Sequence, residues 1–208
     1  MWLLLNRASN YTDYLEAIGH FNVPGQNMIF ASKSGDIALW QQGSFPLRWN
    51  DQGLFVMPGM DSSYMWKGYI PHEENPHSLN PAEGYLSSAN QRAADSSYPY
   101  FMPGSYEVYR PITINRKLAA MSNITAQDMQ SLQNNNYNVF AEDARPILLK
   151  YTIEEQLTAD EKKYFSMVAS WNLMNDATEK APTCFTAWWD SLQADVFNDE
   201  LLKDKMPI

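Results

Sequence analysis

The sequence predicts an α+β protein with antiparallel strands in its first half and helices in its second half. Three observations support this fold class. Residues 1–104 are rich in Gly, Pro and aromatic residues, and short apolar runs there are bounded by turn residues. Beyond residue 105, apolar residues recur at helical spacing, and residue types typical of helix caps precede them. We therefore expect a β-rich part at 1–104 and a helical part at 105–208, both within one domain of a longer chain.

The first half is expected to open with a helix followed by a β-hairpin. Asn10 or Thr12 would cap a helix whose apolar face is formed by Tyr11, Tyr14, Leu15 and Ile18. Residues 27–43 contain two apolar runs around a turn, in which Gly35 supplies the freedom to adopt a positive φ. Residues 44–84 then carry five prolines, which predicts a long surface path with short extended pieces.

The second half contains several helix signals. Pro111 suits a first helical turn, and Thr125 begins another helical segment. Residues Thr158 to Glu161 form a capping-box pattern. Helical spacing continues along two sets of apolar residues: Met129, Leu132, Phe140, Ala144 and Leu148, then Phe185, Trp188, Trp189, Leu192 and Val196.

Composition excludes several classes of function. The formal net charge is -9 and no basic run is present, so nucleic-acid binding is not expected, because phosphate contacts need clustered Lys and Arg. No run of about 18 apolar residues occurs, which predicts no membrane-spanning helix. Cys184 is the only cysteine, which excludes an intrachain disulfide and a cysteine-based metal site.

Residue types that carry chemistry occur in four groupings. His72 and His77 lie in "HEENPH", but their spacing differs from that of a zinc-binding helix, and Pro76 would break such a helix, so a solvated loop is favoured. Five acids offer a glycosidase-type pair, although ordinary surface acids explain them as well: Asp61, Glu73, Glu74, Glu83 and Asp95.

The other two groupings are nucleophiles and aromatic residues. Cys184 is expected to pack as a small hydrophobic residue, and the Gly-Ser junctions at Ser44 and Ser105 are weak signals of self-cleavage. The stripe of Phe185, Trp188 and Trp189 is either a binding platform or, as its helical spacing favours, part of a core.

The segment "GYLSSANQR", residues 84–92, reads as a strand that ends at an amide. Gly84 suits the turn before it, and Tyr85 and Leu86 give the run apolar weight. Small residues follow, and then Asn90, Gln91 and Arg92. This pattern indicates either a polar loop or a hydrogen-bond donor directed into a site.

Five ordered stretches of the chain resemble the penicillin acylase family. They are "VPGQNMIFASKSGDIALWQQGSFPLR", "PGMDSSYMWKGYIPHEENPHSLNPAEGYLSSANQR", "YPYFMPGSYEVYRPITINRKL", "ITAQDMQSLQ" and "SWNLMND". No single stretch is unique to that family, but the ordered series covers most of the chain. The resemblance implies an N-terminal-nucleophile hydrolase, whose core is an αββα sandwich of two antiparallel sheets between helices.

The resemblance also implies a reaction and two site residues. In that family a precursor cuts itself, and the serine exposed at the start of the β chain attacks an amide carbonyl with its own amine as the base. Asn90 falls on the family's oxyanion-hole asparagine, and Gln91 stands where the family has a second asparagine. Arg110 falls on an arginine that supports the site from the following helix. Family substrates are β-lactam side-chain amides and acyl-homoserine lactones.

The serine nucleophile is expected to lie outside these residues. Neither Ser44 nor Ser105 matches the family's serine, and Met1 begins the chain. We therefore expect an inner fragment of the β chain that is inactive alone and has the rest of its own precursor as its partner. No cofactor is expected for the chemistry, while family members often bind a structural calcium ion. Family habit suggests a periplasmic or secreted bacterial protein.

One alternative class remains open. The abundant aromatic residues also suit a module that binds a carbohydrate or a protein without catalysis. A glycosidase is a more distant alternative, because it needs two convergent carboxyl groups about 5 to 10 Å apart in a cleft.

Overall fold

The computed structural model describes the backbone of residues 1–203 and side chains through residue 198. The chain divides into two compact units, residues 1–120 and 121–208. Unit 1 contains α1 (Trp2–Leu5), α2 (Tyr11–Gly19), β1 (Gln26–Ala31), β2 (Ile37–Gln42), β3 (His77–Leu79) and α3 (Tyr109–Ala120). Unit 2 contains α4 (Ala126–Gln133), α5 (Val139–Tyr151), α6 (Ala159–Ala169) and α7 (Ala181–Lys203). Short 3-10 helices occur at Ser62–Tyr64, His72–Glu74 and Glu154–Gln156.

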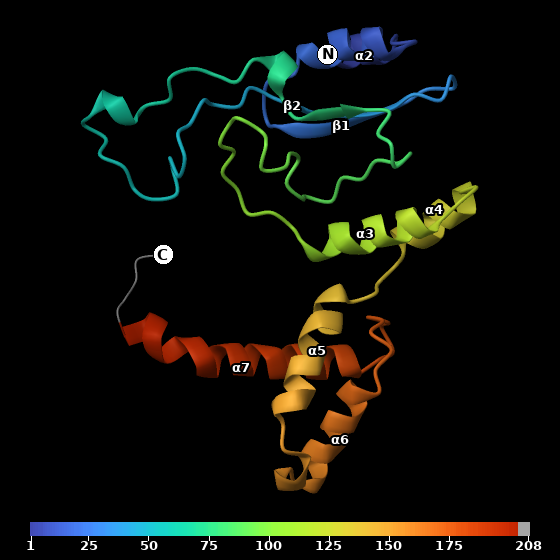
Figure 1. Ribbon diagram of the computed structural model, residues 1–208, viewed down its shortest axis with the longest axis vertical. Helices are drawn as coiled ribbons and strands as arrows, with labels where there is room; N and C mark the ends of the chain where they lie inside the picture. The colour runs from blue at the N-terminus through green and yellow to red at the C-terminus, as the bar shows by residue number, and fades with distance from the viewer. Residues whose placement is uncertain (204–208) are drawn as a thin grey trace. The chain divides into compact units, whose positions relative to one another are not determined.

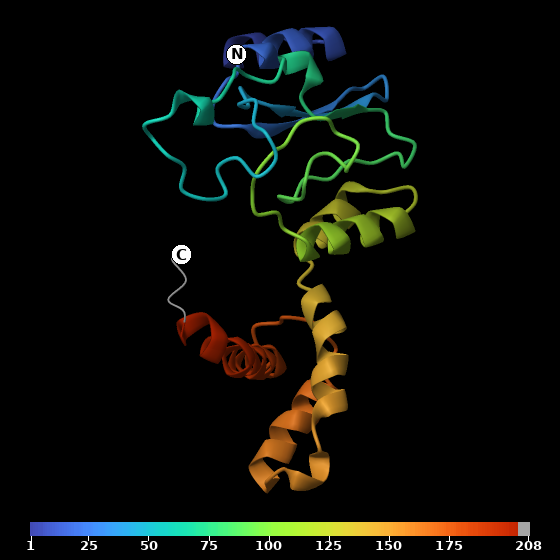
Figure 2. The ribbon, with the colours of Figure 1, turned by 60° about the vertical axis from the view of Figure 1, so that its left-hand side comes forward.

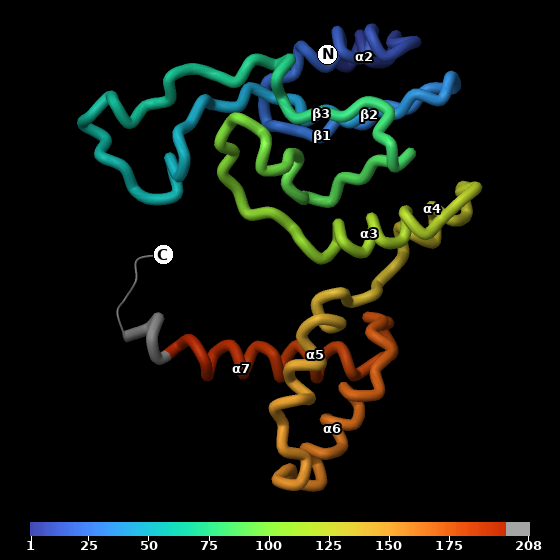
Figure 3. The backbone as a smooth tube through the Cα atoms, viewed as in Figure 1, coloured from blue at the N-terminus to red at the C-terminus, as the bar shows by residue number. Residues whose placement is uncertain are grey.

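The predicted hairpin is confirmed and forms most of an antiparallel sheet. Strand order is β1-β2-β3, with Met28 opposite Trp40 and His77 also opposite Trp40. Gly35 turns the hairpin with φ +100°, a conformation that side chains with a Cβ rarely adopt. The path between β2 and β3 has irregular structure apart from two 3-10 turns and an isolated bridge between Pro46 and Tyr69, as its prolines predicted. Figure 3 shows β3 returning beside β2.

Helix α2 covers one face of this sheet (Figure 1). Its predicted N-cap is confirmed at Asn10, whose side chain accepts a hydrogen bond from the Asp13 amide at 2.9 Å. Tyr14 and Ile18 are buried against Trp40, and the Tyr14 hydroxyl donates to the Met28 carbonyl at 2.9 Å. This core fixes β1 and β2 in place.

The segment after β3 lies along the other face of the sheet (Figures 1 and 2). Asn27 Nδ2, on β1, donates to Ser88 Oγ at 2.8 Å, which ties the two together. The strand expected before Asn90 in the segment 84–92 is not formed: Tyr85 to Ser88 pair with no strand in the described residues, and the chain bends at Ala89 and Asn90.

Unit 2 is built around a core shared by α5, α6 and α7. In Figure 1, α7 crosses α5, and α6 lies beside α5. The predicted capping box at Thr158 and Glu161 is confirmed, and Thr125 forms another with Asp128. The helical spacing from Met129 to Leu148 spans two helices, because the run ends at an asparagine-rich turn, 134–136, and Asn138 caps the next helix.

The α+β fold class is confirmed. The described residues hold one three-stranded antiparallel sheet, all of it in the first half, and the second half is helical. The expected division at 104/105 follows composition, whereas the contacts within the chain place α3 with the sheet.

Candidate active site around Asn90

Asn90 occupies a sharp bend that comes directly after an extended segment. Its φ is +63°, in the left-handed region, where asparagine is several-fold enriched over other residues with a Cβ. Its carbonyl accepts a hydrogen bond from the Glu107 amide at 2.9 Å. Ala89, just before it, is buried, while Asn90 itself is exposed. The bend therefore projects the Asn90 side chain outward from a well-packed neighbour.

Arg110 determines the orientation of the Asn90 carboxamide. Arg110 Nη2, near the start of α3, donates to an Asn90 side-chain atom at 2.9 Å. A guanidinium group can only donate, so the atom that it meets is the carbonyl oxygen Oδ1. The two hydrogens on Nδ2 then face away from Arg110. Nδ2 has no acceptor among the described residues and is free to donate to a ligand.

Glu107 links this arginine to the bend. One carboxylate oxygen accepts from the backbone amides of Tyr109 and Arg110, at 3.1 and 3.4 Å, at the N-terminal end of α3. The other lies 3.9 Å from Arg110 Nε. The Arg110 side chain is 60% exposed, so this ion pair contributes little stability, and its role is to hold the guanidinium near Asn90.

A small cavity lies beside this bend, between the sheet and the segment that follows Gly84. Its volume is about 160 Å³. Asn27 and Leu39 from the sheet line it, together with Ser87, Gln91 and Arg92 from the segment. Asn90 itself does not line this cavity, but its neighbour Gln91 does, so the cavity adjoins the Asn90 bend.

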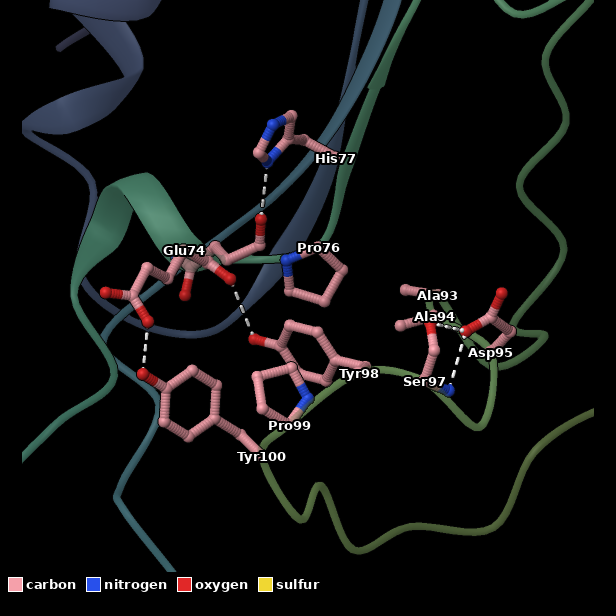
Figure 4. Close-up of a pocket in the computed structure, with 11 residues that line it drawn as sticks. Glu74, Pro76, His77, Ala93, Ala94, Asp95, Ser97, Tyr98, Pro99 and Tyr100 are labelled. Carbon is pink, nitrogen blue, oxygen red and sulfur yellow. Dashed lines mark hydrogen bonds between the residues drawn. The ribbon is translucent and has the colours of Figure 1, made fainter.

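A larger cavity of about 540 Å³ in unit 1 shares His77 and Ala93 with the small cavity (Figure 4). Tyr98 and Tyr100 stand over Glu74, and both hydroxyls donate to it, Tyr98 to its carbonyl and Tyr100 to its carboxylate. Burial, the Tyr100 ring and the Glu74 charge raise the pKa of Tyr98 to about 12. Both tyrosine hydroxyls therefore stay protonated near neutral pH, and both donate their hydrogen to Glu74.

Two of the acids considered for a glycosidase, Glu74 and Asp95, line this larger cavity. Figure 4 shows them on opposite sides of it. Two hydrogen bonds from Ser97 lower the pKa of Asp95, so that carboxyl group is ionised near neutral pH. A glycosidase needs one carboxyl group kept protonated as a general acid. Asp95 is therefore not suited to be the general acid of a glycosidase pair.

Ser44 and His72 also come together, but with their hydrogens in the wrong places for a nucleophile and base. Gln42 Nε2 donates to the Phe21 carbonyl at 3.1 Å and faces His72 Nδ1 at 3.3 Å. His72 Nδ1 must therefore accept, and the neutral ring carries its hydrogen on Nε2, 3.4 Å from Ser44 Oγ. Ser44 in turn donates to Asn22 Oδ1 at 3.0 Å. This series of hydrogen bonds is structural. A catalytic base would have to accept the Ser44 proton, whereas His72 donates to Ser44.

The remaining sequence candidates do not converge on a site. The His77 ring stacks on Trp40 at 4.0 Å, whereas His72 contacts Gln42 and Ser44. Among the described residues no group of three or more His, Cys, Asp or Glu is placed to hold a metal ion. Cys184 packs against Met167, with the two sulfurs 3.9 Å apart.

The aromatic stripe on α7 behaves as the core interpretation predicted. Phe185 is buried in the core of unit 2, and Trp188 and Trp189 pack against that core. Phe140 meets Phe185 and Trp189 edge to face. A platform displayed for a carbohydrate or a protein is therefore not found in this stripe.

Comparison with solved structures places this scaffold in a known fold class. A thermostable penicillin G acylase from Alcaligenes faecalis superposes with a TM-score of 0.64 over 85% of this chain and 32% of that chain, at 24% sequence identity. The α+β scaffold is thus part of a penicillin acylase fold.

Sequence comparison then identifies the family. The profile of the penicillin amidase family matches residues 1–207, and the chain belongs to that family. An acyl-homoserine lactone acylase QuiP from Pseudomonas syringae pv. tomato is 26% identical over 98% of this chain and 26% of its own length. A penicillin acylase 2 proenzyme from Pseudomonas sp. (strain SE83) is 23% identical over 87% of this chain and 23% of its own length. The chain thus spans about a quarter of the length of these relatives.

Two sets of contacts that complete this region were not predicted from the sequence, those of Glu107 and those of the Gln91 side chain. Glu107 precedes Arg110 by three residues and lies just before a helix, which is a recognisable signal for an acid near a helix N-terminus. The contacts of Gln91 had no comparable signal, because a glutamine gives no sequence indication of which backbone groups it will reach.

Proposed function

We propose that the full-length protein containing this chain hydrolyses a non-peptide linear amide through an acyl-enzyme. The substrate would be a β-lactam side-chain amide or an N-acyl compound such as an acyl-homoserine lactone, as the names of the relatives suggest. The nucleophilic serine is proposed to lie outside residues 1–208, in another part of the same autocatalytically processed precursor. A periplasmic or secreted location is proposed on the habit of the family, and among the described residues no helix is long and apolar enough to cross a membrane.

In this proposal Asn90 is the donor of the oxyanion hole. When serine attacks an amide, negative charge develops on the former carbonyl oxygen. Asn90 Nδ2 offers a neutral donor whose direction is set before the reaction begins, because Arg110 holds Oδ1 at 2.9 Å. A preorganised donor stabilises the developing charge without reorganisation during the reaction. The Arg110–Asn90 hydrogen bond is the single observation that supports this role most directly.

Arg110 is the supporting residue in this mechanism. Its exposed guanidinium also places a positive charge on the side of the carboxamide opposite to Nδ2. That charge polarises the amide and makes its N–H groups better donors. Arg110 would therefore act through Asn90, without contacting the substrate.

The experiment that tests this role is Asn90→Ala in the full-length protein. We expect kcat to fall by about 100-fold or more, because one oxyanion-hole donor contributes about 3 kcal/mol to the barrier. Release of a chromogenic amine from an acyl amide measures the rate, and circular dichroism checks the fold. A fall of less than about threefold would remove Asn90 from the mechanism.

The position of the nucleophile has its own test. Purified residues 1–208 should release no product from the same acyl amide, because positioning groups alone cannot replace a nucleophile. The full-length protein should turn the substrate over in parallel. Turnover by residues 1–208 at a rate near that of the full-length protein would show that the nucleophile lies within them.

A further inference from the structure

Gln91 makes contacts that a surface glutamine after a bend does not need. Its Oε1 accepts the Ala89 amide hydrogen at 2.6 Å, and its Nε2 donates to the Ser87 carbonyl at 2.9 Å. Both backbone groups belong to the extended segment just before Asn90. The side chain therefore folds back across Asn90 and contacts the main chain on its other side.

These two bonds reproduce the pairing of a β-strand. In an extended chain, the carbonyl of one residue and the amide of the second residue after it point to the same side. Ser87 and Ala89 present such a pair, and the Gln91 carboxamide supplies one acceptor and one donor to it. This explains why residues 85–89 have a strand-like sequence and yet pair with no strand among the described residues.

The same contacts connect the bend to α3 at a second point. Gln91 Nε2 also lies 3.3 Å from Ser87 Oγ, and that hydroxyl donates to Asn115 Oδ1 on α3 at 2.9 Å. Arg110, on the same helix, holds the Asn90 side chain. The helix thus supports the Asn90 carboxamide directly through Arg110, and supports the backbone beneath it through Asn115, Ser87 and Gln91.

The bend itself needs such support. Asn90 holds φ at +63°, a conformation that costs energy for a residue with a Cβ and persists only where surrounding contacts determine it. Gln91 can reach Ala89 and Ser87 only when the chain turns back at Asn90. The clamp and the bend therefore require each other, and the bend sets the direction in which the Asn90 side chain leaves the backbone.

We infer that Gln91 is a positioning residue for the Asn90 carboxamide, and that its two-point clamp on Ala89 and Ser87 holds that donor on the attacked carbonyl oxygen. This inference rests on the proposed function. It assigns to Gln91 a part of the catalytic rate without any contact to the substrate.

The first test is a double-mutant cycle in the full-length protein. Gln91→Met keeps the length of the side chain and removes both hydrogen bonds, so kcat should fall about 10-fold or more with little change in KM, because small misplacement of a catalytic group costs up to about 100-fold. In the Asn90→Ala background the same substitution should change kcat by less than about twofold, since there is no longer a donor to position. Gln127→Met, at an exposed position on α4, is the matched control.

The second variant allows one of the two hydrogen bonds to be restored by a change of pH. Gln91→Glu keeps an acceptor for Ala89 but loses the donor to the Ser87 carbonyl at neutral pH. When pH falls toward about 4.3, the ordinary pKa of glutamic acid, the carboxyl group regains a proton and can donate again. The ratio of variant to parent kcat should therefore rise as pH falls. A ratio that does not rise as pH falls would show that the donor to the Ser87 carbonyl does not contribute to the rate.

The outcomes distinguish this inference from the proposed function. A fall of less than about threefold for Asn90→Ala would overturn the role of Asn90 itself. A large effect of Asn90→Ala together with a kcat within about twofold of the parent for Gln91→Met would overturn only the role of Gln91. An equal loss from Gln91→Met in both backgrounds would also overturn it, because the effect would then not pass through Asn90.

Discussion

The Asn90–Arg110 pair and the Ser44–His72 cluster lie in the same unit. In each case the residue types suggest one role and the geometry supports another. Serine next to histidine is the usual signature of a nucleophile with its base. Asparagine next to arginine is more often a surface contact. Yet the donor hydrogen of Ser44 is used on Asn22, and His72 offers it no free lone pair. The Nδ2 group of Asn90 keeps its hydrogens for a ligand.

The difference comes from what a neighbouring group is able to do. Gln42 is 1% exposed, and its Nε2 group donates to a backbone carbonyl, so it also presents a donor to His72 and thereby fixes the ring tautomer. Arg110 presents a donor to Asn90 and thereby directs the other end of the amide outward. In both places a group that can only donate sets the direction of the next hydrogen bond. In the first case the series of hydrogen bonds ends at Asn22, another protein residue. In the second it ends at Asn90 Nδ2, a donor with no partner among the described residues.

The largest effect that sharpens this comparison is expected from Arg110→Met. The variant keeps an apolar side chain of similar reach but lets the Asn90 carboxamide rotate. We expect kcat in the full-length protein to fall about 10- to 100-fold, less than for Asn90→Ala, because the donor is still present but no longer held. Steady-state hydrolysis of an acyl amide measures this change.

Two further variants separate the hydrogen bond from the charge. Arg7→Met removes the same charge at an exposed position near the N-terminus and should leave kcat within about twofold of the parent. Arg110→Lys keeps the charge but not the planar fork, and should recover only part of the rate. A rate for Arg110→Met within about twofold of the parent would show that the Asn90 carboxamide does not need this contact.

The sequence predicted the elements whose signals are local. The hairpin around Gly35, the cap at Asn10 and the capping box at Thr158 each depend on residues within a few positions, and each is confirmed. The helical spacing from Met129 to Leu148 did not predict that the chain forms two helices there, α4 and α5. Hydrophobic periodicity considers apolar residues only. It therefore does not detect the three consecutive asparagines that follow α4 or the asparagine that caps α5.

The sequence supplied candidate residues for the site but did not predict its geometry. Asn90 and Arg110 were selected by resemblance, and their role stays a proposal, while the 2.9 Å contact between them joins positions 20 residues apart that no periodicity relates. The strand expected before Asn90 failed for a similar reason. A strand needs a partner, and here the partner is a single side chain, Gln91, whose reach depends on a bend that the sequence does not reveal.

The smallest effect is expected from Ser44→Ala. Loss of this hydroxyl removes one donor to Asn22 and one acceptor for His72, both near the surface of unit 1. We expect kcat/KM of the full-length protein to change by less than about twofold, and the free energy of unfolding to fall by about 1 kcal/mol. Denaturant unfolding and amide hydrolysis, measured on the same preparation, give both quantities, with Ser122→Ala as the exposed control. Should Ser44→Ala abolish formation of the acyl-enzyme, Ser44 would be the nucleophile and the tautomer deduced for His72 would be wrong.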